Sequence, residues 1–185
     1  DRSVSRGLGD VYKRQQQKLW TCYLRKWLVG MLAGWTLDDV VNNVIIVLIG
    51  AQGSGKSTWI AMVLPPELRQ YFYTKTNASR LSKDDLLVLA TYGLMLCEEL
   101  DTMKPSELNQ LKAAVTMLTI DERAAYAHYP EHRPHIASFA ATGNNVQFLS
   151  DPTGNRRWLP FEVESIQSPR EHPFDYPHIL SLIHI

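Results

Sequence analysis

The chain has 185 residues, of which 45% are hydrophobic, and its 19 basic side chains balance its 19 acidic ones. This length suits one domain with one sizeable core, and the charge balance excludes a globally basic surface, so any contact with nucleic acid must come from a local patch. The two cysteines, Cys22 and Cys97, lack metal-ligand spacing, and no apolar stretch reaches the roughly 20 residues that cross a bilayer. We therefore expect a reduced, cytoplasmic protein without a membrane segment.

Both ends of the chain read as translated sequencing adapter. Residues 10–15 are what one strand of a common transposase adapter end encodes, and residues 180–185 are what its reverse complement encodes. We therefore interpret 1–15 and 180–185 as adapter-derived scars and not as native protein. The authentic segment, 16–179, is expected to be a fragment of one domain with a helical lead-in over 16–40.

Between these ends, apolar runs alternate with segments of helical spacing. The run 44–49 is β-branched and lacks alternation, as in a central parallel strand that is covered on both faces. Strands that alternate with helices predict an α/β protein with a mainly parallel sheet, whose chemistry lies at the carboxyl ends of the strands. The expected strands are 44–49, 93–97, 136–141 and 158–163; the expected helices are 19–35, 56–63, 84–90 and 105–118; a hairpin or ordered loop is expected over 119–134.

The most informative motif lies between the first strand and the helix that follows it. Residues 50–57 match the pattern G-x-x-x-x-G-K-[ST], whose glycines let backbone N–H groups surround a phosphate chain. Lys56 would reach the β- and γ-phosphates, and Ser57 would bind Mg²⁺. We therefore expect ATP and Mg²⁺ as ligands, with contacts from Gly50, Gly53, Ser54, Gly55, Lys56, Ser57 and Thr58.

Two later strands end in polar side chains that suit hydrolysis of a nucleotide. Glu98 and Glu99 follow the second apolar run, and we assign Glu99 to activation of the attacking water and Glu98 to the metal. Asn144 follows the third run and would contact the γ-phosphate and the water, with Asn145 as the alternative. Asp101 is left open, because it could simply cap the next segment.

Two adjacent arginines, Arg156 and Arg157, stand in a turn before the last expected strand. An arginine from a neighbouring subunit can neutralise charge in the transition state of phosphoryl transfer, and either residue is a candidate for this role. The alternative is that both are structural or bind a nucleic-acid phosphate.

The order of GAQGSGKS, LMLCEELD, AATGNN and FLSDPTGNRRW along the chain resembles the virulence-associated protein E family of phage and mobile-element proteins. The ATPase region of that family looks like that of superfamily 3 helicases within the AAA+ group. The resemblance implies a P-loop NTPase fold, here truncated, and it favours Glu99 over Glu98 as the base. The chain departs from the family at residues 120–126, where the family commonly is more basic.

The resemblance also implies a function. It predicts an ATPase and DNA helicase, the motor domain of a primase-helicase-like protein in the bacterial host cytoplasm, assembled as a homo-oligomeric ring such as a hexamer. Segment 119–134 would line the channel and bind single-stranded DNA through cations and stacking groups, namely Arg123, Tyr126, His132 and Arg133. Two alternatives stay open: an ATPase that remodels protein, and a nucleotide-dependent regulatory switch.

Overall fold

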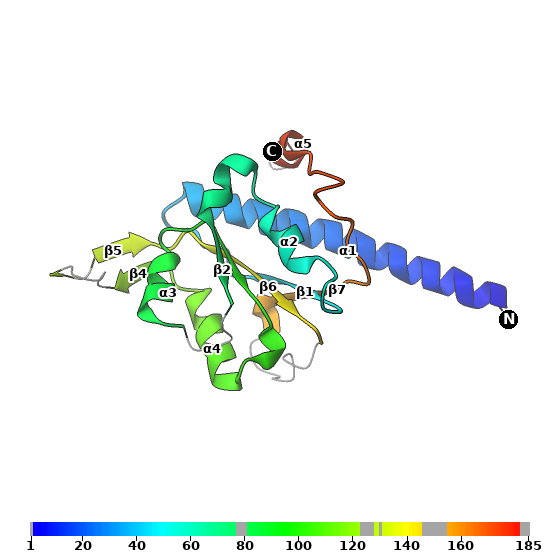
Figure 1. The fold of residues 1–185 in the computed structure, drawn as a ribbon, viewed down its shortest axis with the longest axis horizontal. Helices are drawn as coiled ribbons and strands as arrows, with labels where there is room; N and C mark the ends of the chain where they lie inside the picture. The colour runs from blue at the N-terminus through cyan, green and yellow to red at the C-terminus, as the bar shows by residue number, and fades with distance from the viewer. Residues whose placement is uncertain (1, 77–80, 123–127, 130, 146–154, 182–185) are drawn as a thin grey trace.

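The computed structural model describes residues 2–76, 81–122, 128–129, 131–145 and 155–181. Five strands form one sheet in the order β2-β3-β6-β1-β7, and every pairing in it is parallel (Figure 1). The expected α/β class is therefore confirmed. The strands are β1 (Ile45–Ile49), β2 (Phe72–Lys75), β3 (Leu94–Cys97), β6 (Ser138–Gly143) and β7 (Trp158–Glu162).

The edge strand β2 was not among the expected strands. Its residues, Phe72 to Lys75, include aromatic and β-branched side chains, which are common in strands. This signal in the sequence could have indicated the strand. The strand is short, and only its last residue, Lys75, is buried. A half-covered strand of four residues lacks the continuous apolar run by which the central strands were found.

The helices flank the sheet and mostly match the expected ranges. The helix expected over 105–118 is shorter, because Thr116 and Met117 bond to carbonyls three residues back and so end the α-helix. The chain contains α1 (Arg2–Thr36), α2 (Lys56–Ala61), η1 (Pro66–Tyr71), α3 (Lys83–Val88), η2 (Leu100–Thr102), α4 (Pro105–Ala114), η4 (Asn155–Arg157) and α5 (Tyr176–Ser181). In the part of the chain that the structure describes, none of them is long and apolar enough to span a bilayer.

Side chains from both faces of the sheet are buried, so the domain has three layers. One face, which includes Ile46 and Leu48, packs against α1 and α2. The other face, which includes Val47 and Phe139, packs against α4 and the end of α3. Because β1 is fully covered on both sides, it holds the loop at its carboxyl end on a rigid element.

The long helix α1 is attached to the sheet by its tryptophans. Trp27 lies in the core and donates its indole N–H to the carbonyl of Phe139 at 3.1 Å, and Trp35 donates to the carbonyl of Gly93 at 3.0 Å. An added Cβ at Gly93 would lie 2.9 Å from the Trp35 ring, so this approach requires glycine. The tryptophans of α1 therefore pack against the sheet.

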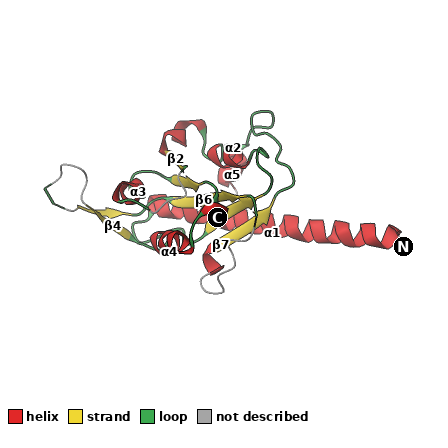
Figure 2. Ribbon diagram, turned by 60° about the horizontal axis from the view of Figure 1, so that its bottom comes forward, coloured by secondary structure: helices red, strands yellow, loops and turns green. Residues whose placement is uncertain are grey.

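Within segment 119–134, β4 (Thr119–Glu122) and β5 (Glu131–Pro134) pair as the antiparallel strands of a hairpin. It projects from the body at the end opposite the N-terminus of α1 (Figure 2). The hairpin alternative of the sequence prediction is therefore confirmed. Its base is joined to the body by His135, whose ring lies 2.7 Å (Nδ1) from the carbonyl of Met117 and packs edge-on against Phe139.

His135 makes the stability of this junction depend on pH. Burial lowers the pKa of His135, and its hydrogen bonds to the backbone only partly oppose this. The unfolded chain therefore takes up a proton more readily than the folded one, so stability is complete above the unfolded pKa of about 6.5 and falls as the pH drops below it. We expect the melting temperature to fall between about pH 7.5 and about pH 5.5, and to fall less in His135→Gln. Equal slopes in the two proteins would contradict this.

Candidate nucleotide-binding site

The glycine-rich loop joins β1 to α2 at the carboxyl edge of the sheet. Gly53 and Gly55 have φ of 80° and 84°, in the left-handed region that suits glycine. Gly50 is required for a different reason, because an added Cβ there would lie 2.3 Å from the carbonyl oxygen of Val163. The N–H of Gly50 also donates to the carbonyl of Gly143 at 3.1 Å, which joins the loop to the end of β6.

The ammonium group of Lys56 lies inside this loop. Its Nζ donates to the carbonyls of Gly50 and Ala51 at 2.8 and 2.7 Å and to Oγ of Ser54 at 3.2 Å. Burial lowers the pKa of Lys56, and the negative charge of Asp101 only partly opposes this. The loop therefore surrounds the ammonium group of Lys56 at the place where phosphates are expected. Phosphate oxygens could take the place of the two backbone carbonyls that this group now contacts.

Ser57 and Glu98 come together from different elements. The hydroxyl of Ser57, in the first turn of α2, donates to Oε1 of Glu98 at 2.6 Å, and Glu98 directly follows β3. The two oxygens could share one Mg²⁺, which usually binds few protein groups and keeps several waters and phosphate oxygens. Among the described residues, no group of three or more His, Cys, Asp or Glu side chains is placed to hold a metal ion.

Glu99 is held in an uncommon backbone conformation. Its φ of 55° and ψ of 49° are left-handed, and among the described residues no other non-glycine residue has a positive φ. Such a conformation costs about 1 kcal/mol or more and is found most often at functional sites. The side chain of Glu99 is exposed, next to Glu98. Glu98 is thus half-buried and bound to Ser57, whereas Glu99 is exposed.

Asn144 is the first residue after β6 and is bound by Asp101. Asp101 Oδ1 accepts the backbone N–H of Asn144 at 3.0 Å, and Oδ2 accepts its side-chain amide at 3.3 Å. The sequence assigned no role to Asp101 beyond a possible cap of the following segment. In the structure, its side chain instead reaches Asn144 at the end of the neighbouring strand β6. Asn145 is exposed beside Asn144.

One cavity of about 320 Å³ brings these elements together. It is formed by the phosphate-binding loop, the end of β3 and the end of β6, three segments that meet because β1, β6 and β3 are neighbours in the sheet. The side chains predicted for nucleotide, metal and water therefore share one site. The lining residues are Gln52, Gly53, Ser54, Gly55, Lys56, Ser57, Thr58, Glu98, Glu99, Thr142, Gly143 and Asn144.

The two arginines lie at the other end of the sheet. Arg157 immediately precedes β7, whose first residue, Trp158, pairs with Ile45 at the start of β1. The length of β1, at about 3.3 Å per residue, separates them from the loop by roughly 15 Å. With Arg156, Arg157 lines a different cavity of about 660 Å³. Within one chain, neither arginine can act on the loop.

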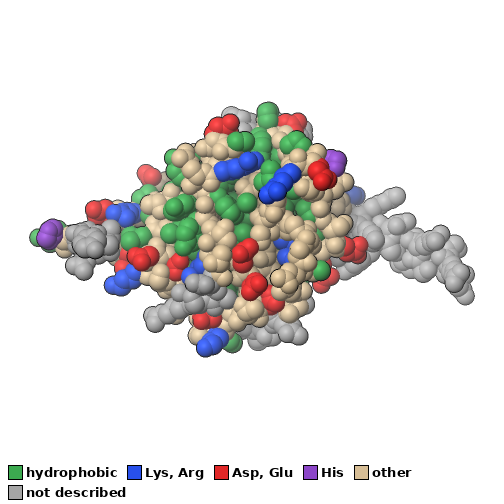
Figure 3. Space-filling view, viewed as in Figure 1, with side chains coloured by type: hydrophobic (Ala, Val, Ile, Leu, Met, Phe, Trp, Pro, Cys, Tyr) green, Lys and Arg blue, Asp and Glu red, His purple; other side chains and the backbone are tan. Residues whose placement is uncertain are grey.

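The hairpin carries charges of both signs. His132 lies 2.5 Å (Nδ1) from Oδ1 of Asp121, and Arg133 lies 2.6 Å from the carboxylate of Glu131. In Figure 3, acidic and basic side chains lie close together near the described part of this projection. Tyr129 near the tip is 79% exposed, so it offers a free ring face. The other two candidates for DNA contact, Arg123 and Tyr126, lie outside the described residues.

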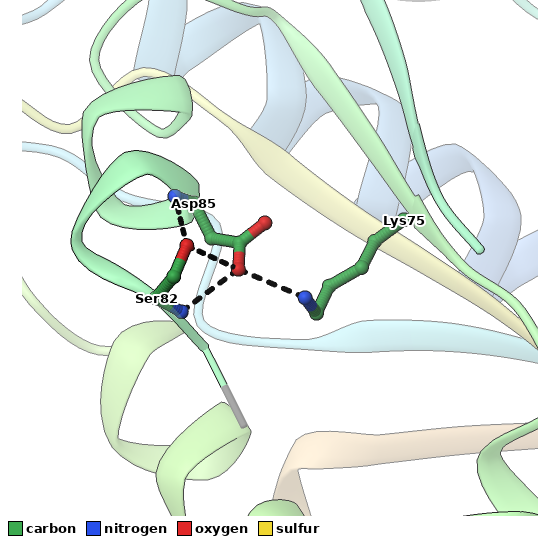
Figure 4. A network of polar contacts seen from close by, with 3 residues as sticks. All are labelled: Lys75, Ser82 and Asp85. Atoms are coloured by element: carbon green, nitrogen blue, oxygen red, sulfur yellow. Dashed lines mark hydrogen bonds and ion pairs between the residues drawn. The ribbon is translucent and has the colours of Figure 1, made fainter. Parts of the chain in front are cut away.

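A buried ion pair beside the site was missed by sequence reasoning. Lys75, the last residue of β2, lies 2.8 Å from Oδ2 of Asp85, and each side chain is 9% exposed (Figure 4). The same oxygen accepts bonds from the N–H and hydroxyl of Ser82 at the start of α3. The Lys75 carbonyl in turn accepts the N–H of Glu98 at 3.3 Å. Ser82 and Asp85 form a capping box that the sequence signals, but their lysine partner depends on β2.

A parallel sheet, a glycine-rich loop between β1 and α2, and carboxylates at the neighbouring strand end together define the P-loop class of α/β fold. The chain belongs to the virulence-associated protein E-like family, whose model matches residues 2–176. The family expected from the order of the motifs is therefore confirmed. No curated protein matches the chain significantly.

Solved structures of the NrS-1 C-terminal region share this fold. Three structures of that region match with TM-scores of 0.51, 0.56 and 0.54 at 13%, 15% and 15% identity, and the first and third are described as apo structures of residues 305–718. Each match covers 86% of this chain. The chain spans only 37–38% of the length of these neighbours.

Proposed function

We propose that this chain is the ATP-hydrolysing part of a phage or mobile-element protein that acts in DNA replication in the bacterial cytoplasm, as a motor on single-stranded DNA. The observation that carries the proposal is the single cavity that holds the loop around Lys56, the Ser57–Glu98 pair, Glu99 and Asn144. Membership of the virulence-associated protein E-like family supports the mobile-element setting.

In the proposed reaction, Lys56 exchanges its loop carbonyls for the β- and γ-phosphates of ATP. Ser57 and Glu98 would hold Mg²⁺, which would neutralise phosphate charge, and Glu99 would orient the water that attacks the γ-phosphorus. Asn144 contacts the γ-phosphate and the same water from the neighbouring strand end. These groups act chiefly by placing charge before the reaction starts, because phosphoryl transfer requires little covalent chemistry from the protein.

The test of this function is ATP turnover with and without single-stranded DNA. We expect turnover in the wild type, stimulation by single-stranded DNA, and a loss of at least about 10²-fold in Glu99→Gln with nucleotide binding retained. The matched control is Glu107→Gln, which alters a carboxylate that caps α4 away from the cavity. ATP turnover that single-stranded DNA does not stimulate would favour the ATPase that remodels protein. Nucleotide binding without turnover would favour the regulatory switch.

The distance of Arg157 from the loop leads to a second prediction, that ATP sites form between subunits of a ring. Arg157→Ala and Glu99→Gln proteins should each be inactive, yet a 1:1 mixture should recover activity at about a quarter of the interfaces, where intact groups meet. The control mixture, Lys56→Ala with Glu99→Gln, should recover none, because both defects lie on the same side of the interface. The same mixture made with Arg156→Ala in place of Arg157→Ala tests whether Arg156 is the arginine that completes the site. No recovery in proven mixed assemblies would contradict a shared site.

A further inference from the structure

We propose that Asp101 is a positioning residue that acts through Asn144, holding the amide of Asn144 in the orientation that reads the γ-phosphate. The inference rests on the proposed ATP hydrolysis. Asp101 is absent from the lining of the nucleotide cavity, whereas Asn144 lines it. Any effect of Asp101 on the reaction must therefore pass through another group or act through its charge.

The two bonds from Asn144 restrict both its backbone and its side chain. The backbone N–H donates to Oδ1 of Asp101 at 3.0 Å, which holds the turn after β6. The amide Nδ2 donates to Oδ2 at 3.3 Å, which holds the side chain. A carboxylate only accepts, so the NH₂ end of the amide must face Asp101. The amide oxygen of Asn144 and its second N–H are then left for the water and the phosphate.

Asp101 reaches Asn144 because of the strained turn before it. The left-handed conformation of Glu99 redirects the chain into η2, and its carbonyl accepts the N–H and the hydroxyl of Thr102 at 2.9 and 2.8 Å. Leu100, fully buried, anchors this short helix in the core. The backbone strain at Glu99 thus has a structural consequence, which is the direction of the Asp101 side chain.

Glycine at the end of β6 permits the close approach. An added Cβ at Gly143 would lie 3.2 Å from Oδ1 of Asp101, so a larger residue would displace the carboxylate by a few tenths of an ångström. The Gly143 carbonyl also accepts the N–H of Gly50 at the start of the phosphate-binding loop. The Asp101–Asn144 contact is therefore directly joined to the loop. The negative charge of Asp101 also acts on Lys56, whose pKa it raises.

The test is a double-mutant cycle of Asp101→Ala and Asn144→Ala in the full chain, read as ATP turnover. We expect Asp101→Ala to lower kcat about 10- to 100-fold while KM changes less than about twofold, and to have little further effect in the Asn144→Ala protein. Asp84→Ala, which removes an exposed carboxylate from α3, should leave kcat unchanged. Losses that multiply in the double variant would overturn the proposal.

A second readout separates this proposal from the proposed function. Each single substitution should raise the equilibrium constant for unfolding in urea. If the two side chains are coupled, the increase in the double variant should be smaller than the product of the two single increases by a factor of at least about two. If the wild type hydrolyses no ATP, the proposed function fails, and this cycle still decides whether the two side chains are coupled. The exchanged pair, Asp101→Asn with Asn144→Asp, should recover this coupling but not turnover, since a carboxylate would then face the phosphate. Independent effects on unfolding would overturn the proposal.

Discussion

Replacement of Lys56 by alanine is expected to lower ATP turnover by about 10²–10³-fold, the loss associated with one preorganised donor at a site of developing charge. Two effects combine here. The variant lacks the cation that would reach the phosphates, and it also lacks the group that bonds to two carbonyls and a hydroxyl of the loop. The loop should therefore lose its shape before the nucleotide arrives, so nucleotide affinity should fall together with turnover.

Lys83 offers a matched control for Lys56. Each is the first residue of its helix, but Lys83 is exposed at the start of α3, whereas Lys56 is buried in the loop. Turnover and nucleotide affinity, measured with fluorescent nucleotide, should be unchanged in Lys83→Ala. A Lys56→Ala protein that is folded and still turns over ATP at the wild-type rate would reject the assignment of the loop.

Removal of Asp85 is expected to have the largest effect on stability. Asp85→Ala leaves Lys75 buried without its partner, and breaking a buried pair from one side typically lowers the free energy of unfolding by about 3–5 kcal/mol. It also removes the acceptor for two bonds from Ser82. Chemical denaturation measures the loss. Asp84→Ala, next to it and exposed, should change the free energy of unfolding by less than about 1 kcal/mol.

The same variant should show its effect only where Asp85 is ionised. Burial raises the pKa of Asp85, but the hydrogen bonds from Lys75 and Ser82 outweigh burial and hold the pKa below its ordinary value. A group with a lowered folded pKa stabilises the protein above its unfolded pKa of about 3.9, and this contribution is lost as the pH falls through the folded value. The difference in stability between wild type and Asp85→Ala should therefore narrow in acid. A difference that stays constant down to about pH 2 would contradict the role of this ion pair.

Much of the candidate site could be predicted because its parts are local in sequence. The phosphate-binding loop is contiguous, and its glycines, Lys56 and Ser57 stand at spacings that the chemistry requires. Glu98 and Asn144 could be placed because each follows a continuous apolar run, and the carboxyl ends of parallel strands share one edge of a sheet. Both residues now line the same cavity as the loop.

Other features depended on the order of the strands, which local periodicity does not reveal. The partner of Asp101 is 43 residues away in sequence, and it is reached because β3 pairs with β6. Lys75 was missed with the whole of β2, an edge strand too short and too exposed to show a buried pattern. His132 and Arg133 were candidates for DNA contact in the sequence, yet in the hairpin His132 contacts Asp121 across the strands and Arg133 pairs with Glu131 on its own strand.

The sequence by itself determined the α/β class, the family, and the loop that would hold a nucleotide, because hydrophobic runs and motifs of a few residues encode these directly. Only the tertiary structure decided which side chains meet. It bound Asn144 to Asp101, and it put Arg157 at the opposite end of β1 from Lys56. Such pairings follow from the strand order and from the direction of each turn, which many weak long-range contacts set together.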